Sequence, residues 1–388
     1  MAKIYTGIDI GTSHIKVVIV VPDSSGGFRI AGTAMSGSKS MRHGYIINVP
    51  DVTNSIREAV DRAEKMAGVR VRSARVAIGG VGLDELRATG EVSLTTSGGE
   101  VTDRDVQRSI KQSEERSSAK LTNRKVIHAI PLAYRIDGNS VFGRPTGMKG
   151  TKLAVDTLLI TAFEQHVQDL ISAIEAAHIE VEDIMASPLA ASLVNLTKAQ
   201  KMAGVVLANI GAETISIVVF ENDVPVSIKV LPGGSADITS DLALSLKIPL
   251  TEAEQMKRGA VTSMDVPRKK IDDIIGNRLK DMFALIDAHL KSIGKQRLLP
   301  AGIVITGGGS GITTVADIAK ATMRLPSSVG TFAAGTGRSI VGDAAWSVAY
   351  GLCRWGYATE QKDRERGVSY ITESLREFFK KMFRSFLP

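Results

Sequence analysis

Two segments of this 388-residue chain resemble each other at an offset of 200 residues, and this duplication constrains the fold more than any other feature. The segments read GIDIGTSHIKVVIV at 7–20 and LANIGAETISIVVF at 207–220. The residues that recur are Ile10, Gly11, Ile15 and Val18, which return as Ile210, Gly211, Ile215 and Val218. In each copy a β-branched run enters a glycine turn and a second β-branched run leaves it, which predicts a hairpin with a tight turn. We therefore expect a chain built from two similar halves.

Helical patterns alternate with these strands. The segment 51–67 places Val52, Ile56, Val60 and Ala63 on one face, and a second helix is expected at 164–178. Such alternation predicts an α/β chain. Between the halves, residues 84–161 read as a small α+β insertion with a helix capped by Thr102, and residues 300–320 read as a buried strand, a glycine-rich turn and a helix.

The composition narrows the class of protein. A hydrophobic content of 44% over 388 residues is sufficient for two domains with cores of their own. The single cysteine, Cys353, excludes an internal disulfide framework and favours a reducing compartment. We expect neither a signal peptide nor a membrane-spanning helix, because no sufficiently long apolar run occurs. The formal charge of +7 suits an anionic partner, either nucleic acid or lipid head groups, and does not choose between them.

The glycine turns are candidate phosphate sites, because a turn without side-chain bulk can direct several N–H groups at one oxygen. Lys16 would add a cation, and Asp9 a carboxylate for water molecules on a bound Mg²⁺. One such turn is equally consistent with a plain hairpin, but three turns together are more specific. The residues predicted to bind the cofactor are Asp9, Gly11, Thr12, Ser13, Lys16, Asn209, Gly211, Ala212, Glu213, Thr214, Gly233, Gly234, Glu254, Lys257, Gly307, Gly308, Gly309 and Ser310. The catalytic residue stays open, with Asp9, Asn209 and Glu213 as candidates.

The C-terminal segment 371–388 is amphipathic when written as a helix of about 100° per residue. Its apolar side carries Leu375, Phe378, Phe379, Met382, Phe383 and Phe386. Its opposite side carries the cations Lys380, Lys381 and Arg384. Aromatic anchors beside a cationic face are typical of a helix that lies in the lipid interface. The alternative is a helix docked on its own domain, and the charge-dense segment 357–370, interpreted as a linker, favours lipid.

These turns, together with the segments 141–162, 231–259, 299–312 and 346–356, resemble the FtsA family of the actin, Hsp70 and sugar-kinase superfamily. The resemblance implies an actin-like duplicated ATPase fold with an inserted SHS2-type α+β subdomain and a C-terminal amphipathic helix. It also implies that the protein binds ATP with Mg²⁺, polymerises under the cytoplasmic membrane and tethers filaments of FtsZ to it. We accordingly expect a peripheral protein on the cytoplasmic face of an anionic membrane, without nucleic acid as a partner.

The resemblance further implies a division into subdomains. Their expected limits are 1–83, 162–186 and 345–356 for 1A; 84–161 for the inserted 1C; 187–240 and 301–344 for 2A; 241–300 for 2B; 357–370 for the linker; and 371–388 for the membrane helix. Subdomain 2B is expected to bind the C-terminal peptide of FtsZ through the helix at 271–290, with Arg278 at a matching basic position. The inserted subdomain is expected to bind other division proteins, and the chain to bind itself in filaments.

The second turn departs from the family pattern. The family usually carries an Asp where this chain has Asn209, whose amide is neutral at every pH and cannot act as a base. Glu213 is the nearest carboxylate, and we expect it to point away from the cleft as a solvated turn residue. Slow or absent ATP hydrolysis follows. Two alternatives stay open: a PilM-like pilus assembly protein, disfavoured by the tail and by PTGMKG at 145–150, and a small-molecule kinase, disfavoured by Asn209.

Overall fold

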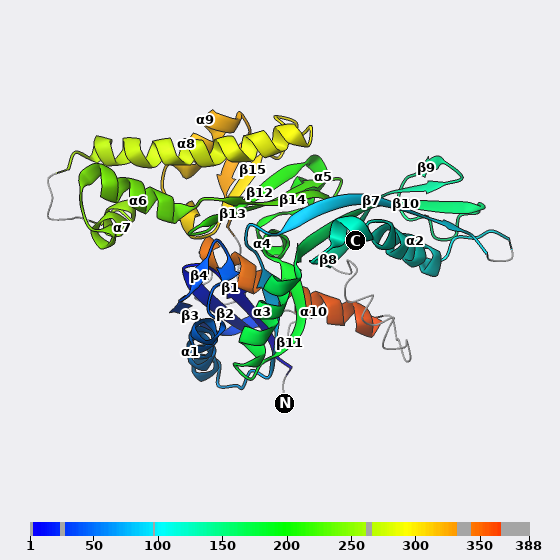
Figure 1. Ribbon diagram of the computed structural model, residues 1–388, viewed down its shortest axis with the longest axis horizontal. Helices are drawn as coiled ribbons and strands as arrows, with labels where there is room; N and C mark the ends of the chain where they lie inside the picture. The colour runs from blue at the N-terminus through cyan, green and yellow to red at the C-terminus, as the bar shows by residue number, and fades with distance from the viewer. Residues whose placement is uncertain (1–2, 24–27, 96–97, 261–265, 332–342, 366–388) are drawn as a thin grey trace.

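The computed structural model describes residues 3–23, 28–95, 98–260, 266–331 and 343–365. Two similar halves meet along the middle of the molecule, and a subdomain inserted into the first half projects to one side (Figure 1). The N-terminal part of the first half is drawn in blue, and the second half mainly in green to yellow. The duplication predicted from the sequence is thus visible in the architecture.

The two predicted hairpins are confirmed, with the same register. β1 (Tyr5–Ile10) pairs antiparallel with β2 (His14–Pro22), and β12 (Val205–Ile210) pairs antiparallel with β13 (Thr214–Glu221). Each turn closes with one backbone hydrogen bond: the Gly11 N–H donates to the carbonyl oxygen of His14 at 3.2 Å, and the Gly211 N–H to that of Thr214 at 2.8 Å. The duplication therefore extends to the turn geometry.

Each hairpin belongs to a five-stranded sheet, and the two sheets have the same strand order. The orders are β3-β2-β1-β6-β11 and β14-β13-β12-β15-β16, with the last three strands of each sheet parallel. Ligands of such α/β sheets bind beyond the carboxyl ends of the parallel strands. The remaining strands are β3 (Phe28–Gly37), β6 (Ser73–Ile78), β11 (Glu180–Ala186), β14 (Val224–Pro232), β15 (Ile303–Thr306) and β16 (Ser327–Val329).

The cores follow from the alternation of side chains along each strand. On β12, Val205 and Leu207 belong to a core that continues into the first half. Val206 and Ala208 belong to a second core, formed with the helices of the second half. Both faces of the strand are therefore buried, as the continuous β-branched run predicts. The first core is lined by helices α4 (Ser187–Asn195) and α10 (Ser347–Glu365), which pack against each other.

Helix α1 (Val49–Ala67) confirms the predicted helix at 51–67. The side chain of Asn48 accepts the backbone N–H of Asp51 and caps its start, and Gly68 in the left-handed region ends it. The predicted stripe of Val52, Ile56, Val60 and Ala63 is buried. The second predicted helix is α3 (Glu164–Glu175), shorter than expected at its C-terminal end. A hairpin of β4 (Met41–Arg42) and β5 (Tyr45–Ile46) precedes α1.

The predicted α+β insertion is confirmed as an antiparallel sheet with the strand order β7-β10-β8-β9. Its elements are β7 (Asp84–Ser93), α2 (Asp103–Arg116), the 3-10 turn η1 (Ser118–Leu121), β8 (Arg124–Ile136), β9 (Asn139–Val141) and β10 (Lys152–Phe163). Thr102 caps α2 in a capping box with Asp105, as the sequence indicates. Helix α2 covers this sheet over a separate hydrophobic core.

The second half carries a helical region above its sheet, where α8 forms the long yellow helix of Figure 1. Ile271, Ile275 and Leu279 of α8 are buried. The helices and short turns of this half are α5 (Lys198–Ala203), α6 (Ser235–Leu246), α7 (Leu250–Lys257), α8 (Arg268–Ser292), η2 (Gly308–Gly311), α9 (Val315–Met323) and η4 (Ala344–Trp346).

Residues 357–370 were expected to be a linker. Helix α10 continues through 357–365, so this part of the segment is helical. The first turns of α10 are buried and start the helix. The residues that follow have no apolar stripe, but their helix propensity is sufficient to extend a helix that has already begun. The rest of the expected linker and the whole amphipathic segment 371–388 lie outside the described residues, so that helix remains a prediction.

Candidate functional site

A cleft of about 760 Å³ lies between the two halves, where both hairpin turns and the third glycine turn meet. The first turns of α6 and one side of α7 complete its wall. Most of the residues predicted to bind a cofactor line this cleft: Asp9, Gly11, Thr12, Ser13, Lys16, Asn209, Gly211, Ala212, Thr214, Glu254, Lys257, Gly307, Gly308 and Gly309. Segments almost 300 residues apart in sequence therefore form one site.

Four predicted residues, Glu213, Gly233, Gly234 and Ser310, lie behind this lining. A Cβ atom on Gly234 would lie 2.3 Å from the carbonyl oxygen of Ala212, so glycine is needed for the close approach to the second turn. The hydroxyl of Ser310 donates to the carbonyl oxygen of Gly307 at 2.7 Å. These two residues shape the turns that the cleft exposes.

The first turn holds a charge pair. Asp9 and Lys16 face each other across β1 and β2, with Oδ2 and Nζ 3.3 Å apart. Burial, and then the positive charges of Lys16 and Arg258, lower the pKa of His14 at the same turn, which keeps its ring neutral near pH 7. The equivalent facing pair in the second hairpin is Asn209 and Ser216, which is uncharged.

The third turn packs directly on the second. Gly307 has a φ of +88°, and a Cβ atom there would lie 2.2 Å from Oδ1 of Asn209 and 2.6 Å from the carbonyl oxygen of Ile210. Both the backbone conformation and the space therefore require glycine. Just before it, the Thr306 hydroxyl lies 2.8 Å from the hydroxyl of Ser347, which begins α10. The turn is thus fixed to elements of both halves.

Glu254 and Lys257 form a fixed cluster at the side of the cleft. Glu254 accepts from Lys257 Nζ at 2.6 Å, from the Thr239 hydroxyl at 2.6 Å and from Arg258 Nε at 2.8 Å. Burial alone would raise the pKa of Glu254, but these donors outweigh it and hold that pKa at about 2. Lys257 also donates to the Ser235 carbonyl oxygen at 3.0 Å. The cluster joins α7 to the N-terminal turn of α6.

Several cleft residues escaped sequence analysis. They include Arg258, beside the predicted Lys257; Ser187, at the start of α4; Ser235, directly after the glycine pair; and Asp343, near α10. The position of Ser235 after two glycines at a helix start was a usable signal, whereas nothing local marks Ser187 or Asp343. Within the described ranges, no group of three or more His, Cys, Asp or Glu side chains is arranged to hold a metal ion.

Glu213 does not line the cleft, and it is not the solvated turn residue that was expected. Its Oε2 atom accepts the backbone N–H of His43 at 2.7 Å and lies 4.0 Å from Nδ1 of the same residue. His43 lies between β4 and β5 in the first half. The second turn is therefore bonded to the opposite half.

Arg278 of α8 makes a bidentate ion pair within its own subdomain. Its Nε and Nη2 atoms donate to the two carboxylate oxygens of Asp241 on α6 at 2.6 and 2.8 Å. About a third of the arginine side chain remains exposed, at 34%. The residue thus joins two helices, and its expected contact with FtsZ stays a prediction.

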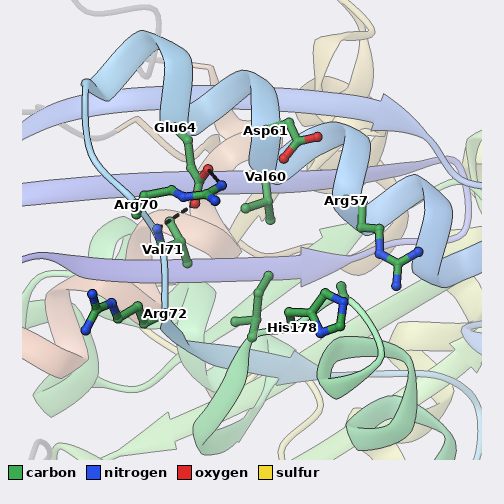
Figure 2. Close-up of a pocket in the computed structure, with 10 residues that line it drawn as sticks. Arg57, Val60, Asp61, Glu64, Arg70, Val71, Arg72 and His178 are labelled. Atoms are coloured by element: carbon green, nitrogen blue, oxygen red, sulfur yellow. Dashed lines mark hydrogen bonds and ion pairs between the residues drawn. The ribbon is translucent and has the colours of Figure 1, made fainter.

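A second cavity, of about 460 Å³, lies between α1, the segment before β6 and the turn before β11 (Figure 2). Val60 and Val71 supply part of its apolar wall. On its rim, Glu64 accepts the Val71 N–H at 2.6 Å and lies 3.3 Å from Nη1 of Arg70. Cations and anions are mixed around this rim, so its charge does not select a ligand. It shares no lining residue with the cleft.

No helix in the part of the chain that the structure describes is long and apolar enough to cross a membrane.

Solved structures of other proteins share the fold of this chain. The PilM–PilN type IV pilus biogenesis complex matches with a TM-score of 0.69 and 19% identity, covering 91% of this chain and 98% of that chain. MreB 5 of Spiroplasma citri bound to AMPPNP matches with a TM-score of 0.53 and 13% identity, covering 95% and 100%. At these identities the similarity shows the fold alone. The fold is that of an actin-like ATPase, with an added α+β subdomain.

The sequence relatives identify the family. The family model for "Cell division protein FtsA" matches residues 206–351, and that for "SHS2 domain inserted in FTSA" matches 82–161. FtsA of Neisseria meningitidis is 30% identical over 345 residues, covering 82% of this chain and 81% of the relative. FtsA of Pseudomonas aeruginosa is 27% identical over 389 residues, covering 95% and 92%. The chain belongs to the FtsA family of cell-division proteins.

Proposed function

We propose that this cell-division protein binds ATP with Mg²⁺ in the cleft, polymerises at the cytoplasmic face of the membrane and links FtsZ filaments to that membrane. The observation that carries the proposal is the meeting of three glycine turns in one cleft between duplicated halves. One fold neighbour, MreB 5 of Spiroplasma citri, has AMPPNP bound, which supports a nucleotide in a cleft of this kind.

The cleft residues suit a nucleotide in distinct ways. The turns at Thr12 and Ala212 face the same space from opposite halves, and their backbone N–H groups are the donors we assign to the phosphates. The start of α6, which lines the cleft at Ser235, adds the positive end of a helix dipole. Gly308 leaves open space around its Cα, which suits the approach of a nucleoside.

Mg²⁺ fits the donor set through Asp9. This carboxylate lies in the cleft, and a single carboxylate suits a hydrated Mg²⁺ that takes its other ligands from water and phosphate oxygens. When bound, the ion would neutralise phosphate charge. Lys16, at 3.3 Å from Asp9, would supply a further positive charge on the same side.

Hydrolysis is expected to be slow. Phosphoryl transfer to water depends on a positioned nucleophile and on compensation of developing charge. Asn209 lines the cleft where a carboxylate is expected in this superfamily, and Glu213 is engaged with His43. We therefore assign nucleotide a structural role, in which binding stabilises the closed state by mass action.

We assign membrane binding to residues 371–388. Their apolar side would lie in the lipid interface while Lys380, Lys381 and Arg384 contact anionic head groups. One tail would bind reversibly, whereas a filament that presents many tails would bind with avidity. The C-terminal FtsZ peptide is assigned to subdomain 2B near Arg278, and other division proteins to the inserted subdomain.

Liposome pelleting with and without ATP tests the proposal. The full chain should pellet with anionic vesicles, and ATP should increase the pelleted fraction because polymers bind through several tails. A chain ending at 365 is the control for the tail. Pelleting of this truncated chain to the same extent as the full chain would overturn the membrane assignment, and the absence of any ATP effect would overturn the link to nucleotide.

A further inference from the structure

The hydrogen bond between Glu213 and His43 joins the two halves beside the cleft. Neither residue lines the cleft, so binding of a ligand there does not by itself account for the bond. Glu213 follows Ala212 in the second turn, so any shift of that turn moves its side chain too. Its carboxylate accepts the His43 N–H at 2.7 Å, and its own carbonyl oxygen accepts the Gly233 N–H at 3.1 Å. A charge-assisted bond to a backbone donor is among the stronger hydrogen bonds in proteins.

The loop that carries His43 continues the connection into the first half. The carbonyl oxygen of His43 accepts the Val81 N–H at 3.3 Å. The next residue, Gly44, has a φ of +83°, and a Cβ atom there would lie 2.4 Å from the Cα of Gly80. Two backbone segments therefore pack directly on each other, without side chains that could absorb a displacement.

Gly80 and Val81 belong to the segment that enters the inserted subdomain, because β7 begins at Asp84. On its other side this entry segment is held by the insertion itself: Arg124 of β8 donates to the carbonyl oxygen of Gly82 at 2.7 Å. A displacement of His43 would thus be passed to the base of the insertion.

A second set of bonds ties the same base to the second half. Glu85 accepts the Ile228 N–H at 2.6 Å and the Ser227 hydroxyl at 2.9 Å, and Asp84 lies 2.7 Å from Nζ of Lys229. These partners are on β14, which ends at Pro232, next to the glycine pair behind the second turn. Both connections therefore lead from the base of the insertion to the same side of the cleft.

We infer that Glu213 is a positioning residue that fixes the second turn against the first half, so that closure of the cleft on a nucleotide phosphate also sets the inserted subdomain. The inference rests on the proposed nucleotide site and adds the device that connects it to the insertion. Glu213 acts through the His43 backbone and does not touch the nucleotide. Filament and partner contacts made by the insertion would then depend on the ligand in the cleft.

The test compares Glu213→Ala with Glu213→Gln. Gln keeps an acceptor oxygen for the His43 N–H, whereas Ala removes it. Glu221→Ala is the matched control, because Glu221 lies on the same hairpin but pairs with Lys295 away from the cleft. Two readouts are needed: the affinity for ATP with Mg²⁺ by calorimetry, and hydrogen exchange of the His43 and Val81 amides and of residues 84–87.

We expect Glu213→Ala to weaken ATP binding by roughly tenfold, in line with the loss of one hydrogen bond to a charged group. Glu221→Ala should stay close to the parent, and Glu213→Gln, which keeps the acceptor oxygen but loses its charge, should lie between the parent and Glu213→Ala. In the nucleotide-free protein, Glu213→Ala should speed exchange at His43 and Val81. ATP should slow exchange over 84–87 in the parent and not in Glu213→Ala.

Other outcomes of these measurements would overturn the inference or one part of it. Equal ATP affinity of the parent and Glu213→Ala would overturn the positioning role, and so would loss of affinity in Glu213→Gln to the same extent as in Glu213→Ala. Unchanged exchange over 84–87 on adding ATP to the parent would overturn the connection to the insertion. If the parent binds no ATP, the proposed function fails, and the nucleotide-free exchange at His43 and Val81 still decides whether Glu213 holds this loop.

Discussion

Asp9 and Lys16 face each other across the first hairpin with Oδ2 and Nζ 3.3 Å apart, and the equivalent residues of the second hairpin, Asn209 and Ser216, are both uncharged. The second half therefore lacks both the acid and the base of this pair. An unpaired lysine or carboxylate at a partly buried site would carry the large desolvation cost of a charge, which a neutral amide and hydroxyl avoid. The charge that the cleft can offer to phosphates is consequently asymmetric between the halves.

The third turn offers a test of nucleotide binding that leaves the fold intact. A Cβ atom on Gly308 meets nothing within 4 Å, so Gly308→Asp should fold while placing a negative charge in the cleft. It should abolish ATP-dependent thermal stabilisation, which is about 2.7 kcal/mol at a ligand concentration 100 times the Kd. Asp9→Ala should have the same effect through loss of Mg²⁺. Gly308→Ala, which adds only a methyl group, is the control and should bind; normal binding by Gly308→Asp would place the nucleotide elsewhere.

A buried histidine predicts an acid-sensitive fold. Burial lowers the pKa of His128 to about 4, and its Nε2 atom accepts the Ala186 N–H at 3.1 Å. Because the unfolded chain then binds more protons than the folded one, stability falls as the pH drops from about 6.5 to about 4, by about 3 kcal/mol from this group. His128→Gln should lose this part of the pH dependence in urea unfolding, whereas His178→Gln at an exposed position should keep it. Parallel pH profiles for the parent and His128→Gln would argue against a buried neutral ring.

The tail prediction separates apolar from electrostatic attachment. Phe379→Glu combined with Phe383→Glu should release the protein from vesicles at any salt concentration, because each large apolar side chain contributes roughly 1.5 to 3 kcal/mol when buried. Lys380→Gln combined with Lys381→Gln should weaken binding mainly on anionic lipid and at low salt. Flotation with vesicles of both compositions measures the difference. Equal loss on neutral and anionic vesicles in the lysine variant would contradict the electrostatic part.

The partner prediction concerns Arg278. Arg278→Glu should lower the affinity of the subdomain for a C-terminal FtsZ peptide roughly tenfold, as for a lost charge-assisted contact, and leave ATP affinity unchanged. Because Arg278 also pairs with Asp241, the control is Asp241→Ala, which breaks the same ion pair and keeps the arginine. If both variants lose peptide affinity equally in fluorescence anisotropy, the effect is one of subdomain structure and the docking site lies elsewhere.

Turnover should be very slow in the parent, because Asn209 cannot act as a base. Phosphate release from lipid-bound filaments at saturating ATP measures it, and Asn209→Asp should raise the rate if a carboxylate at this position orients the attacking water. Glu213→Ala should leave the rate at saturating ATP close to that of the parent. Fast release by the parent that disappears in Glu213→Ala would mean that this glutamate has taken over catalysis.

The sequence by itself determined those features that are encoded within a few neighbouring residues. The hairpins at Gly11 and Gly211 follow from β-branched runs on either side of a small residue, and the start of α2 follows from the cap at Thr102. The repeat of the first pattern 200 residues later was sufficient to predict two like halves. Such features are recognisable because their partners lie close by along the chain.

Only the tertiary structure decided which side chains meet across the molecule. Glu213 reaches His43 from 170 residues away, and Glu85 reaches the backbone of Ile228 from 143 residues away, so no local pattern marks either contact. The same holds for α10, whose residues 357–365 have the composition of a linker but continue a helix that begins in the core. A helix or turn follows from its own sequence, whereas the direction and partner of a polar side chain depend on which elements the fold brings beside it.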